Sequence, residues 1–193
     1  MYLQTMPDSL PGRIILLNGA SSAGKSTLCR AIQEAADVPL LQFSLDFFLF
    51  GHGVLPARRE EGGDFDWAVM RPKLFEGYFG CLAALAQAGN NLVVDYIIET
   101  PEQLARLSEG LRPYDVFFVG VHCPLPELER RERQRGDRQA GDARKDFQTV
   151  HTFSTYDFEI DSTLAAKANA LAVLEAWRTR EGPGVFTGRG AGG

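Results

Sequence analysis

"LLNGASSAGKST", residues 16–27, decides the fold because it matches the phosphate-loop pattern G-x-x-x-x-G-K-[ST]. The apolar run "RIILLN" (13–18) precedes it and a helix-compatible segment follows, which is the strand-to-helix setting that such a loop requires. Gly19 and Gly24 let the backbone turn so that its N–H groups point inward toward a phosphate. A chance glycine turn is the alternative. The full pattern in this setting favours a nucleotide-phosphate site.

Each part of this loop has an expected task. The backbone N–H groups and the positive end of the following helix would hold phosphates. The Lys25 ammonium would reach the β- and γ-phosphates, and the Ser26 hydroxyl would ligate Mg²⁺. The expected nucleotide-binding residues are Gly19, Ala20, Ser21, Ser22, Ala23, Gly24, Lys25 and Ser26.

Composition narrows the class of protein. The 193 residues, 45% of them hydrophobic, are enough for one substantial core. The net charge of −5 disfavours a general nucleic-acid binder, and no apolar run approaches the roughly 18 residues of a membrane span. Cys29, Cys81 and Cys123 lack CxxC spacing, which favours buried, reduced thiols. We therefore expect a cytoplasmic protein with neither nucleic-acid nor membrane partners.

Short β-rich runs alternate with longer helical runs, which predicts parallel strands joined by crossover helices. The strand runs are continuously apolar, as in sheets that are covered on both faces. The expected fold class is therefore α/β, with a five-stranded parallel sheet flanked by helices on both faces. The expected strands are residues 13–18, 39–43, 91–97, 115–121 and 157–161.

The chain divides by composition into one domain and two ends. Residues 13–180 are expected to form the domain, after an N-terminal extension at 1–12. A glycine-rich stretch at 181–193 predicts a disordered tail. Two segments interrupt the strand-helix rhythm, a glycine-rich, charged one at 51–67 and a basic, lid-like one at about 130–146. Loops near strand ends carry function in open α/β sheets.

Two helix starts can be placed from the sequence. Thr100 followed by Pro101 is typical of an N-cap with proline at the first helical position. Ser162 or Thr163 is expected to cap a helix over residues 164–177. Both helices would follow predicted strands.

Two aspartates follow or end predicted strands. Asp95 closes "NLVVD" and is expected to supply the second metal-side carboxylate beside Ser26, although aspartate also suits a turn at such a position. Asp46 lies just beyond the second strand, where neighbouring strands open on one crevice. A carboxylate there can accept the proton of an attacking hydroxyl, and the alternative is an aspartate that only caps a turn.

Aromatic side chains surround Asp46 in the sequence and allow two interpretations. They could form a pocket for a small, partly apolar substrate, or they could be ordinary core. These residues are Phe47, Phe48, Phe50, Phe65 and Trp67.

Arginines are concentrated in "ERRERQRGDRQAGDARK", where they could close over a triphosphate or form a solvated helix face. Arg131, Arg135 and Arg138 share one face at i, i+4 and i+7, which favours them as transition-state stabilisers. His151 could contact a substrate or be a hydrogen-bonded structural histidine. His122 and Cys123 would point to opposite faces of a strand, which argues against a shared metal.

Three sequence blocks resemble the chloramphenicol phosphotransferase family, whose members use ATP to phosphorylate the primary hydroxyl of that antibiotic. The blocks are "ILLNGASSAGKS" (15–26), "ERQRGDRQAG" (132–141) and "VHTFSTYDFEIDST" (150–163), and the resemblance spans about residues 13 to 178. It implies a P-loop NTPase or kinase-like fold and ATP held by residues 19–27, Thr27 included. It also implies Asp46 as general base and Arg131, Arg135 and Arg138 as lid arginines.

The sequence departs from the family at positions that would shape the acceptor pocket. The family has paired acidic residues after the third strand, whereas Asp95 is followed here by Tyr96, and residues 47–70 are dissimilar. The leading hypothesis is therefore an ATP- and Mg²⁺-dependent phosphotransferase acting on a hydroxyl of a small molecule, with chloramphenicol-like compounds first. A nucleoside or nucleotide kinase and a non-catalytic ATP-binding regulatory module are the alternatives. Antibiotic resistance is a role to test and does not follow from the residues.

Overall fold

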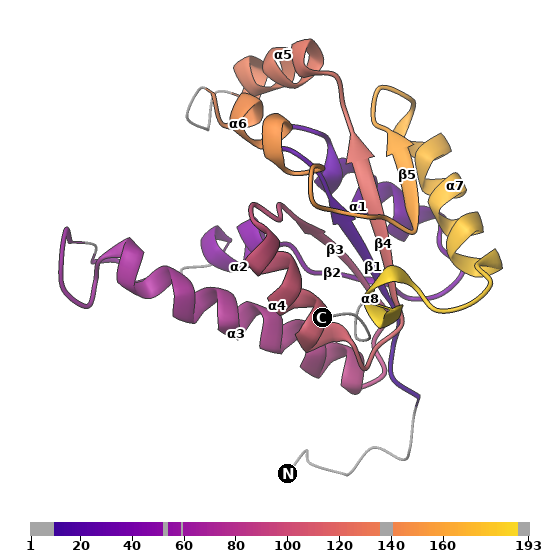
Figure 1. The fold of residues 1–193 in the computed structure, drawn as a ribbon, viewed down its shortest axis with the longest axis horizontal. Coiled ribbons are helices and arrows are strands. Elements are labelled where there is room, and N and C mark those ends of the chain that lie inside the picture. The colour runs from indigo at the N-terminus through magenta and orange to yellow at the C-terminus, as the bar shows by residue number, and fades with distance from the viewer. Residues whose placement is uncertain (1–9, 52–53, 59, 136–140, 189–193) are drawn as a thin grey trace.

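The computed structural model describes residues 10–51, 54–58, 60–135 and 141–188. Its centre is a five-stranded parallel sheet in the order β2-β3-β1-β4-β5 (Figure 1). The strands are β1 (Ile14–Asn18), β2 (Leu41–Gln42), β3 (Leu92–Tyr96), β4 (Val116–His122) and β5 (Phe158–Asp161). The expected five parallel strands are confirmed, although β2 is only two residues long.

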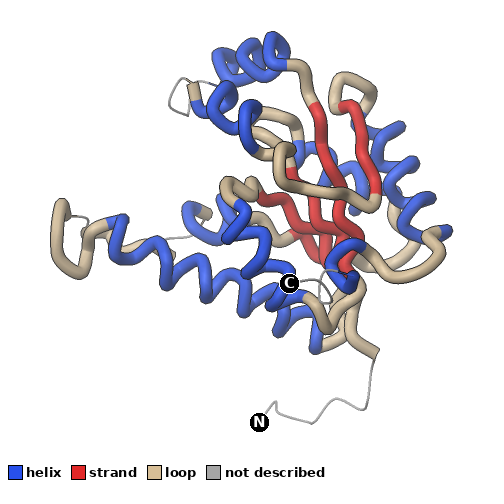
Figure 2. Tube along the Cα trace, viewed as in Figure 1, coloured by secondary structure: helices blue, strands red, loops and turns tan. Residues whose placement is uncertain are grey.

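Eight helices lie in the described part of the chain, and Figure 2 shows them around the strands. They are α1 (Lys25–Ala35), α2 (Leu45–Phe50), α3 (Trp67–Gln87), α4 (Pro101–Leu111), α5 (Leu125–Arg135), α6 (Asp142–Thr149), α7 (Ala166–Thr179) and α8 (Val185–Gly188). None of them is both long enough and apolar enough to cross a bilayer.

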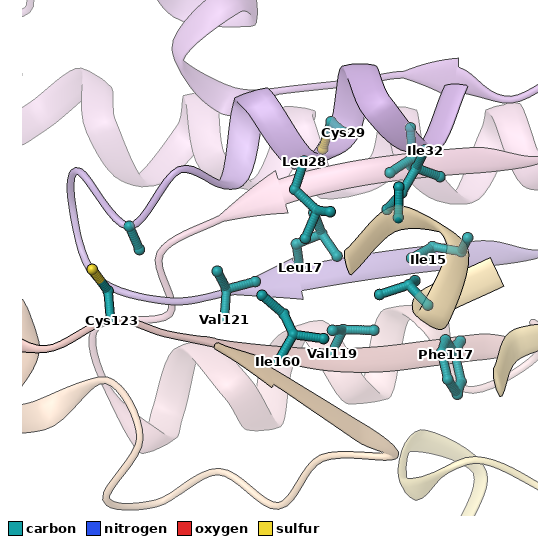
Figure 3. Close-up of a cluster of buried hydrophobic side chains, with 14 of the residues drawn as sticks. Ile15, Leu17, Leu28, Cys29, Ile32, Phe117, Val119, Val121, Cys123 and Ile160 are labelled. Carbon is teal, nitrogen blue, oxygen red and sulfur yellow. The ribbon is translucent and has the colours of Figure 1, made fainter. Parts of the chain in front are cut away.

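The two faces of β1 pack against different helices because successive side chains alternate across a strand. Ile15 and Leu17 join a buried cluster with residues of α1 and α7. Figure 3 shows these two side chains beside Leu28, Cys29 and Ile32 of α1. Ile14 and Leu16 join a second cluster with residues of α3, α4 and α8. All five residues of β1 are buried, and the first four form a continuous apolar run.

Two cysteines lie in the first of these clusters. Cys29 of α1 and Cys123 after β4 are buried, whereas Cys81 is partly exposed, and all three thiols are free. Burial raises the pKa of the Cys29 thiol well above its usual value. The expectation of buried thiols therefore holds for two of the three cysteines.

Of the two helix starts predicted from the sequence, that of α4 is confirmed and that of α7 is not. The Thr100 hydroxyl accepts a hydrogen bond from the Gln103 amide, and Pro101 opens α4 as expected. The prediction that Ser162 or Thr163 caps the last long helix was wrong. Helix α7 begins later, at Ala166, and has no side-chain cap. Instead, the amide and the hydroxyl of Thr163 both donate hydrogen bonds to the Asp161 carboxylate.

The prediction of a disordered tail after residue 180 also needs correction. Instead of a disordered tail from 181, residues Val185–Gly188 form α8, and the Phe186 ring is buried with its centroid 5.1 Å from that of Phe118. A Cβ at Gly184 would lie 2.5 Å from the carbonyl oxygen of Val116. Glycine at this position therefore lets the backbone before α8 approach the backbone of β4 closely. Residues 189–193 lie outside the described part.

Candidate functional site

The loop between β1 and α1 has a backbone that its glycines make possible. A Cβ on Gly19 would lie 2.5 Å from the carbonyl oxygen of Val121, so the close approach to β4 excludes a side chain. Gly24 caps α1 with a φ of 89°, and Ser22 also has a positive φ, of 62°. The loop therefore presents its amides and the positive end of an 11-residue helix at one place.

Lys25, the first residue of α1, crosses back over this loop. Its side chain is 8% exposed, and Nζ donates hydrogen bonds to the carbonyl oxygens of Gly19 and Ala20, each over 2.8 Å. The ammonium is therefore held against the backbone of the phosphate loop.

Ser26 and Asp95 meet at the junction of α1 and β3. The Ser26 hydroxyl donates to Oδ2 of Asp95 over 2.5 Å, and Asp95 is 7% exposed. The other carboxylate oxygen, Oδ1, is buried and has no hydrogen-bond partner within the described residues. A buried, unsatisfied carboxylate oxygen beside a hydroxyl is a donor set that fits Mg²⁺, which prefers hard oxygen ligands.

A cleft of about 930 Å³ brings most of the expected site residues together. Those that line it are Ser21, Ser22, Gly24, Lys25, Ser26, Thr27, Asp46, Asp95, Arg131 and Arg135. Gly19, Ala20 and Ala23 belong to the same loop but are buried beneath its surface. Arg138 falls in the segment 136–140, outside the described residues.

Asp46 lies in the first turn of α2, which Ser44 caps by accepting from the Phe47 amide. Asp46 also borders a second hollow of about 520 Å³ next to the cleft, which Phe47 lines as well. The sequence placed this carboxylate beyond the second strand, and β2 with its following turn does carry it to the cleft.

The aromatic residues near Asp46 divide between pocket and core. Trp67 lines the cleft and is 40% exposed, and Phe47 lines the neighbouring hollow. Phe48 packs against Phe43 and Tyr78, with ring centroids 5.9 and 5.6 Å away. Phe65 lies beneath the Arg58 guanidinium. The side chain of Phe50 lies outside the described part. Trp67 and Phe47 therefore line hollows at the surface, whereas Phe48 packs with other aromatic rings.

Arg131 is fixed by contacts that the sequence does not reveal. Its Nε donates to Glu127 over 2.7 Å, Nη2 donates to the Ser162 carbonyl over 2.9 Å, and Nη1 donates to the Ala23 carbonyl over 3.2 Å. Ser162 thereby serves as an anchor for Arg131 and not as a helix cap. One guanidinium joins α5, the phosphate loop and the turn after β5.

Within the basic segment, Glu132 of α5 binds the start of α6. It is 8% exposed and accepts hydrogen bonds from the amides of Gly141 and Ala143, over 3.0 and 2.9 Å. These two bonds, with that from Ala143 the stronger, lower the pKa of Glu132. No sequence signal identified it, because a glutamate in a run of charged residues reads as solvated.

Asp146 is a further contact to the loop that the sequence reasoning missed. Its Oδ2 accepts from the Ser21 amide over 2.9 Å. Burial raises the pKa of the Asp146 carboxyl, against the lowering effects of the Ser21 amide and Lys25. Helix α6 therefore contacts the backbone of the phosphate loop through one carboxylate.

The "VHTFSTYDFEIDST" block is mainly structural. Asn18, fully buried at the end of β1, donates to the Tyr156 hydroxyl over 2.9 Å and accepts from the Ile98 amide over 3.0 Å. The Tyr156 hydroxyl also lies 2.7 Å from Nδ1 of His151, whose ring stacks on that of His122 with centroids 4.0 Å apart. These contacts support the structural interpretation of His151 over a substrate contact.

Acidification should destabilise this network. Burial, with the neighbouring His122, lowers the pKa of His151 from 6.5 to about 4. A base whose pKa falls on folding contributes stability above pH 6.5 that is lost as pH drops toward 4. Because His151 is partly exposed, we expect a loss of about 1 kcal/mol at pH 5. Melting curves at pH 7 and pH 5 should show a smaller difference in His151→Gln than in the wild type. Equal differences would contradict this role.

Comparisons with known proteins agree with this geometry. A sequence model of the family described as chloramphenicol phosphotransferase-like protein matches residues 12–178. A relative in Mycobacterium tuberculosis, named "Putative O-phosphotransferase", is 32% identical over 185 residues, covering 83% of this chain and 80% of the relative. A guanylate kinase of Rhodopirellula baltica is 29% identical over 174 residues, covering 78% of this chain and 80% of that protein.

A solved structure shows the same architecture. The Mycobacterium tuberculosis APS kinase in complex with AMPPNP and APS has a TM-score of 0.67 at 18% sequence identity, and the match covers 88% of this chain and 99% of that one. This likeness shows a P-loop kinase-like α/β fold. Because the family model matches residues 12–178 and the M. tuberculosis relative is 32% identical over most of its length, the chain belongs to the chloramphenicol phosphotransferase-like family.

Proposed function

We propose that this protein is an ATP- and Mg²⁺-dependent phosphotransferase that transfers the γ-phosphoryl group to a hydroxyl of a small molecule, with chloramphenicol-like alcohols as first candidates. The observation that carries the proposal is one cleft lined by the phosphate loop, Lys25 and a carboxylate on a separate helix, Asp46. Family membership and a kinase-like fold support the class of reaction.

The nucleotide would bind at the loop end of the cleft. Amides from Gly19 to Thr27 and the N-terminus of α1 would hold the phosphates. Lys25, now bound to two loop carbonyls, would turn to the β- and γ-phosphates. Arg131 and Arg135 line the same cleft and would stabilise charge on the transferred group, together with Arg138.

Ser26 and Asp95 would hold Mg²⁺, through the hydroxyl and the carboxylate whose Oδ1 has no partner within the described residues. The ion would supply positive charge that neutralises the β- and γ-phosphate oxygens.

Asp46 would accept the proton of the acceptor hydroxyl. As this proton moves to the carboxylate, the hydroxyl oxygen forms a bond to the γ-phosphorus and the bond from that phosphorus to the β–γ bridging oxygen breaks. ADP leaves, and the acceptor becomes a phosphate ester. The aromatic Trp67 beside the cleft suits a partly apolar acceptor.

Incubation with ATP, Mg²⁺ and a panel of hydroxylated molecules, read by product mass, tests this proposal. The panel is led by chloramphenicol and includes nucleosides and nucleoside monophosphates, because a guanylate kinase is among the relatives and nucleotide kinase is the second candidate. We expect a product heavier by one phosphoryl group from an alcohol. A phosphorylated nucleotide would support the second candidate. Nucleotide binding with no phosphorylated product from any acceptor would contradict both kinases and favour a regulatory module.

A further inference from the structure

Residues of α3 and of the end of β3 line part of the cleft, and we call this part the acceptor wall. It consists of Trp67, Arg71 and Phe75 of α3, Tyr96 at the end of β3, and Glu99 just beyond it. The inference below rests on the proposed function, because it names how that same cleft would choose its acceptor.

Arg71 and Glu99 neutralise each other in this wall. The Arg71 Nη2 lies 2.9 Å from Glu99 Oε2, and the guanidinium also lies over the Phe75 ring, 4.8 Å from its centroid. The two side chains are 37% and 41% exposed, so the pair stands at the surface of the cleft. An anionic group that entered here would meet Glu99 beside the only guanidinium of the wall.

Tyr96 packs against the same Phe75 ring over which the Arg71 guanidinium lies. The side chain is 3% exposed and its ring packs against Phe75, Tyr78 and Phe79, with centroids 6.3, 6.2 and 5.7 Å away. Its hydroxyl is buried without a hydrogen-bond partner among the described residues. A tyrosine hydroxyl is a neutral hydrogen-bond donor at neutral pH.

An unsatisfied buried hydroxyl needs a reason, since phenylalanine would fill the same space without the cost of desolvating a polar group. Tyr96 lines the cleft, so an acceptor that binds there can supply the missing partner.

We propose that Glu99 and Tyr96 determine acceptor specificity. Glu99, by occupying Arg71, excludes acceptors that carry a phosphate or carboxylate, and the Tyr96 hydroxyl donates a hydrogen bond to an uncharged polar group such as a carbonyl. The acceptor class is therefore an aromatic alcohol with an uncharged hydrogen-bond acceptor. Nucleoside monophosphates are excluded by charge.

Two probes of the same shape test the charge preference, para-(hydroxymethyl)benzamide and para-(hydroxymethyl)benzoate. Their binding to the full chain is measured by ligand-observed NMR without ATP, so the result does not depend on turnover. We expect the wild type to prefer the benzamide. Glu99→Gln should tighten benzoate binding about ten-fold, because Arg71 is released to pair with it. Glu76→Gln is the matched control, since Glu76 pairs with Arg106 on α3 and α4 without lining the cleft.

Tyr96→Phe tests the hydroxyl separately from the ring. We expect about five- to ten-fold weaker benzamide binding, with a melting temperature equal to or above that of the wild type. A purely structural Tyr96 would leave binding unchanged. The proposal is overturned if the wild type binds the benzoate as tightly as the benzamide, if neither probe binds, or if neither variant changes binding. Phosphoryl transfer without charge preference would overturn this inference alone, whereas charge-selective binding without any transfer would contradict the proposed function alone.

Discussion

Asp46→Asn should lower the rate of phosphoryl transfer about 10³-fold, the range expected for loss of a general base, while nucleotide affinity changes less than about two-fold. Asparagine keeps the size of the side chain but cannot take the proton of the acceptor hydroxyl. Nucleotide binding should persist because Asp46 lies on α2, whereas the phosphates would bind the loop before α1. Transfer rates with the acceptor found in the panel assay, and calorimetric titration with a non-hydrolysable ATP analogue, measure the two effects.

A surface carboxylate supplies the control for this variant. Asp37 pairs with Arg178 at 3.0 Å, is 67% exposed and does not line the cleft. Asp37→Asn should therefore transfer phosphoryl groups at the wild-type rate. If Asp46→Asn retained a tenth or more of the wild-type rate, the general base would have to be another group.

Lys25→Met should lower kcat/KM about 10³-fold or more, because the ammonium would stabilise the charge that develops on the transferred phosphoryl group. The side chain is buried, so methionine can occupy its space, but the carbonyls of Gly19 and Ala20 lose their donor. We therefore expect the free energy of unfolding of Lys25→Met to be about 1 to 3 kcal/mol lower than that of the wild type. Initial rates and a thermal melt of the same preparation separate the two effects.

Lys167→Met provides the comparison for Lys25→Met, since Lys167 is an exposed residue of α7 and lies outside the cleft. It should leave both the rate and the melting temperature close to wild type. A folded Lys25→Met protein with kcat/KM within ten-fold of wild type would remove Lys25 from the proposed transfer step.

Patterns of residues close together in the sequence were enough to predict the sheet and the phosphate loop. Apolar runs such as 13–18 specify strands because burial on both faces demands continuous hydrophobicity. Gly19 and Gly24 specify the loop because the close approach at one and the positive φ at the other exclude side chains. Thr100 and Pro101 similarly specify a helix start through contacts within one turn.

The sequence predictions failed where a distant residue took over a local role. Ser162 looks like a helix cap, but Arg131 of α5 binds its carbonyl, and α7 starts later. The glycines near Gly184 suggest disorder, yet the Asp157 carboxylate accepts from the Val185 amide, and Phe186 fills the core beside Phe118. Both partners lie tens of residues away, so no local pattern could reveal them.

The sequence by itself determined the parallel sheet, the phosphate loop and the candidate carboxylates Asp46 and Asp95, because each depends on residues that are neighbours along the chain. Only the tertiary structure decided what surrounds them. Asp146 against the Ser21 amide and Glu99 against Arg71 join positions 125 and 28 residues apart. Such pairs form when packed helices bring polar groups together out of water, and their identity depends on the geometry of the whole fold.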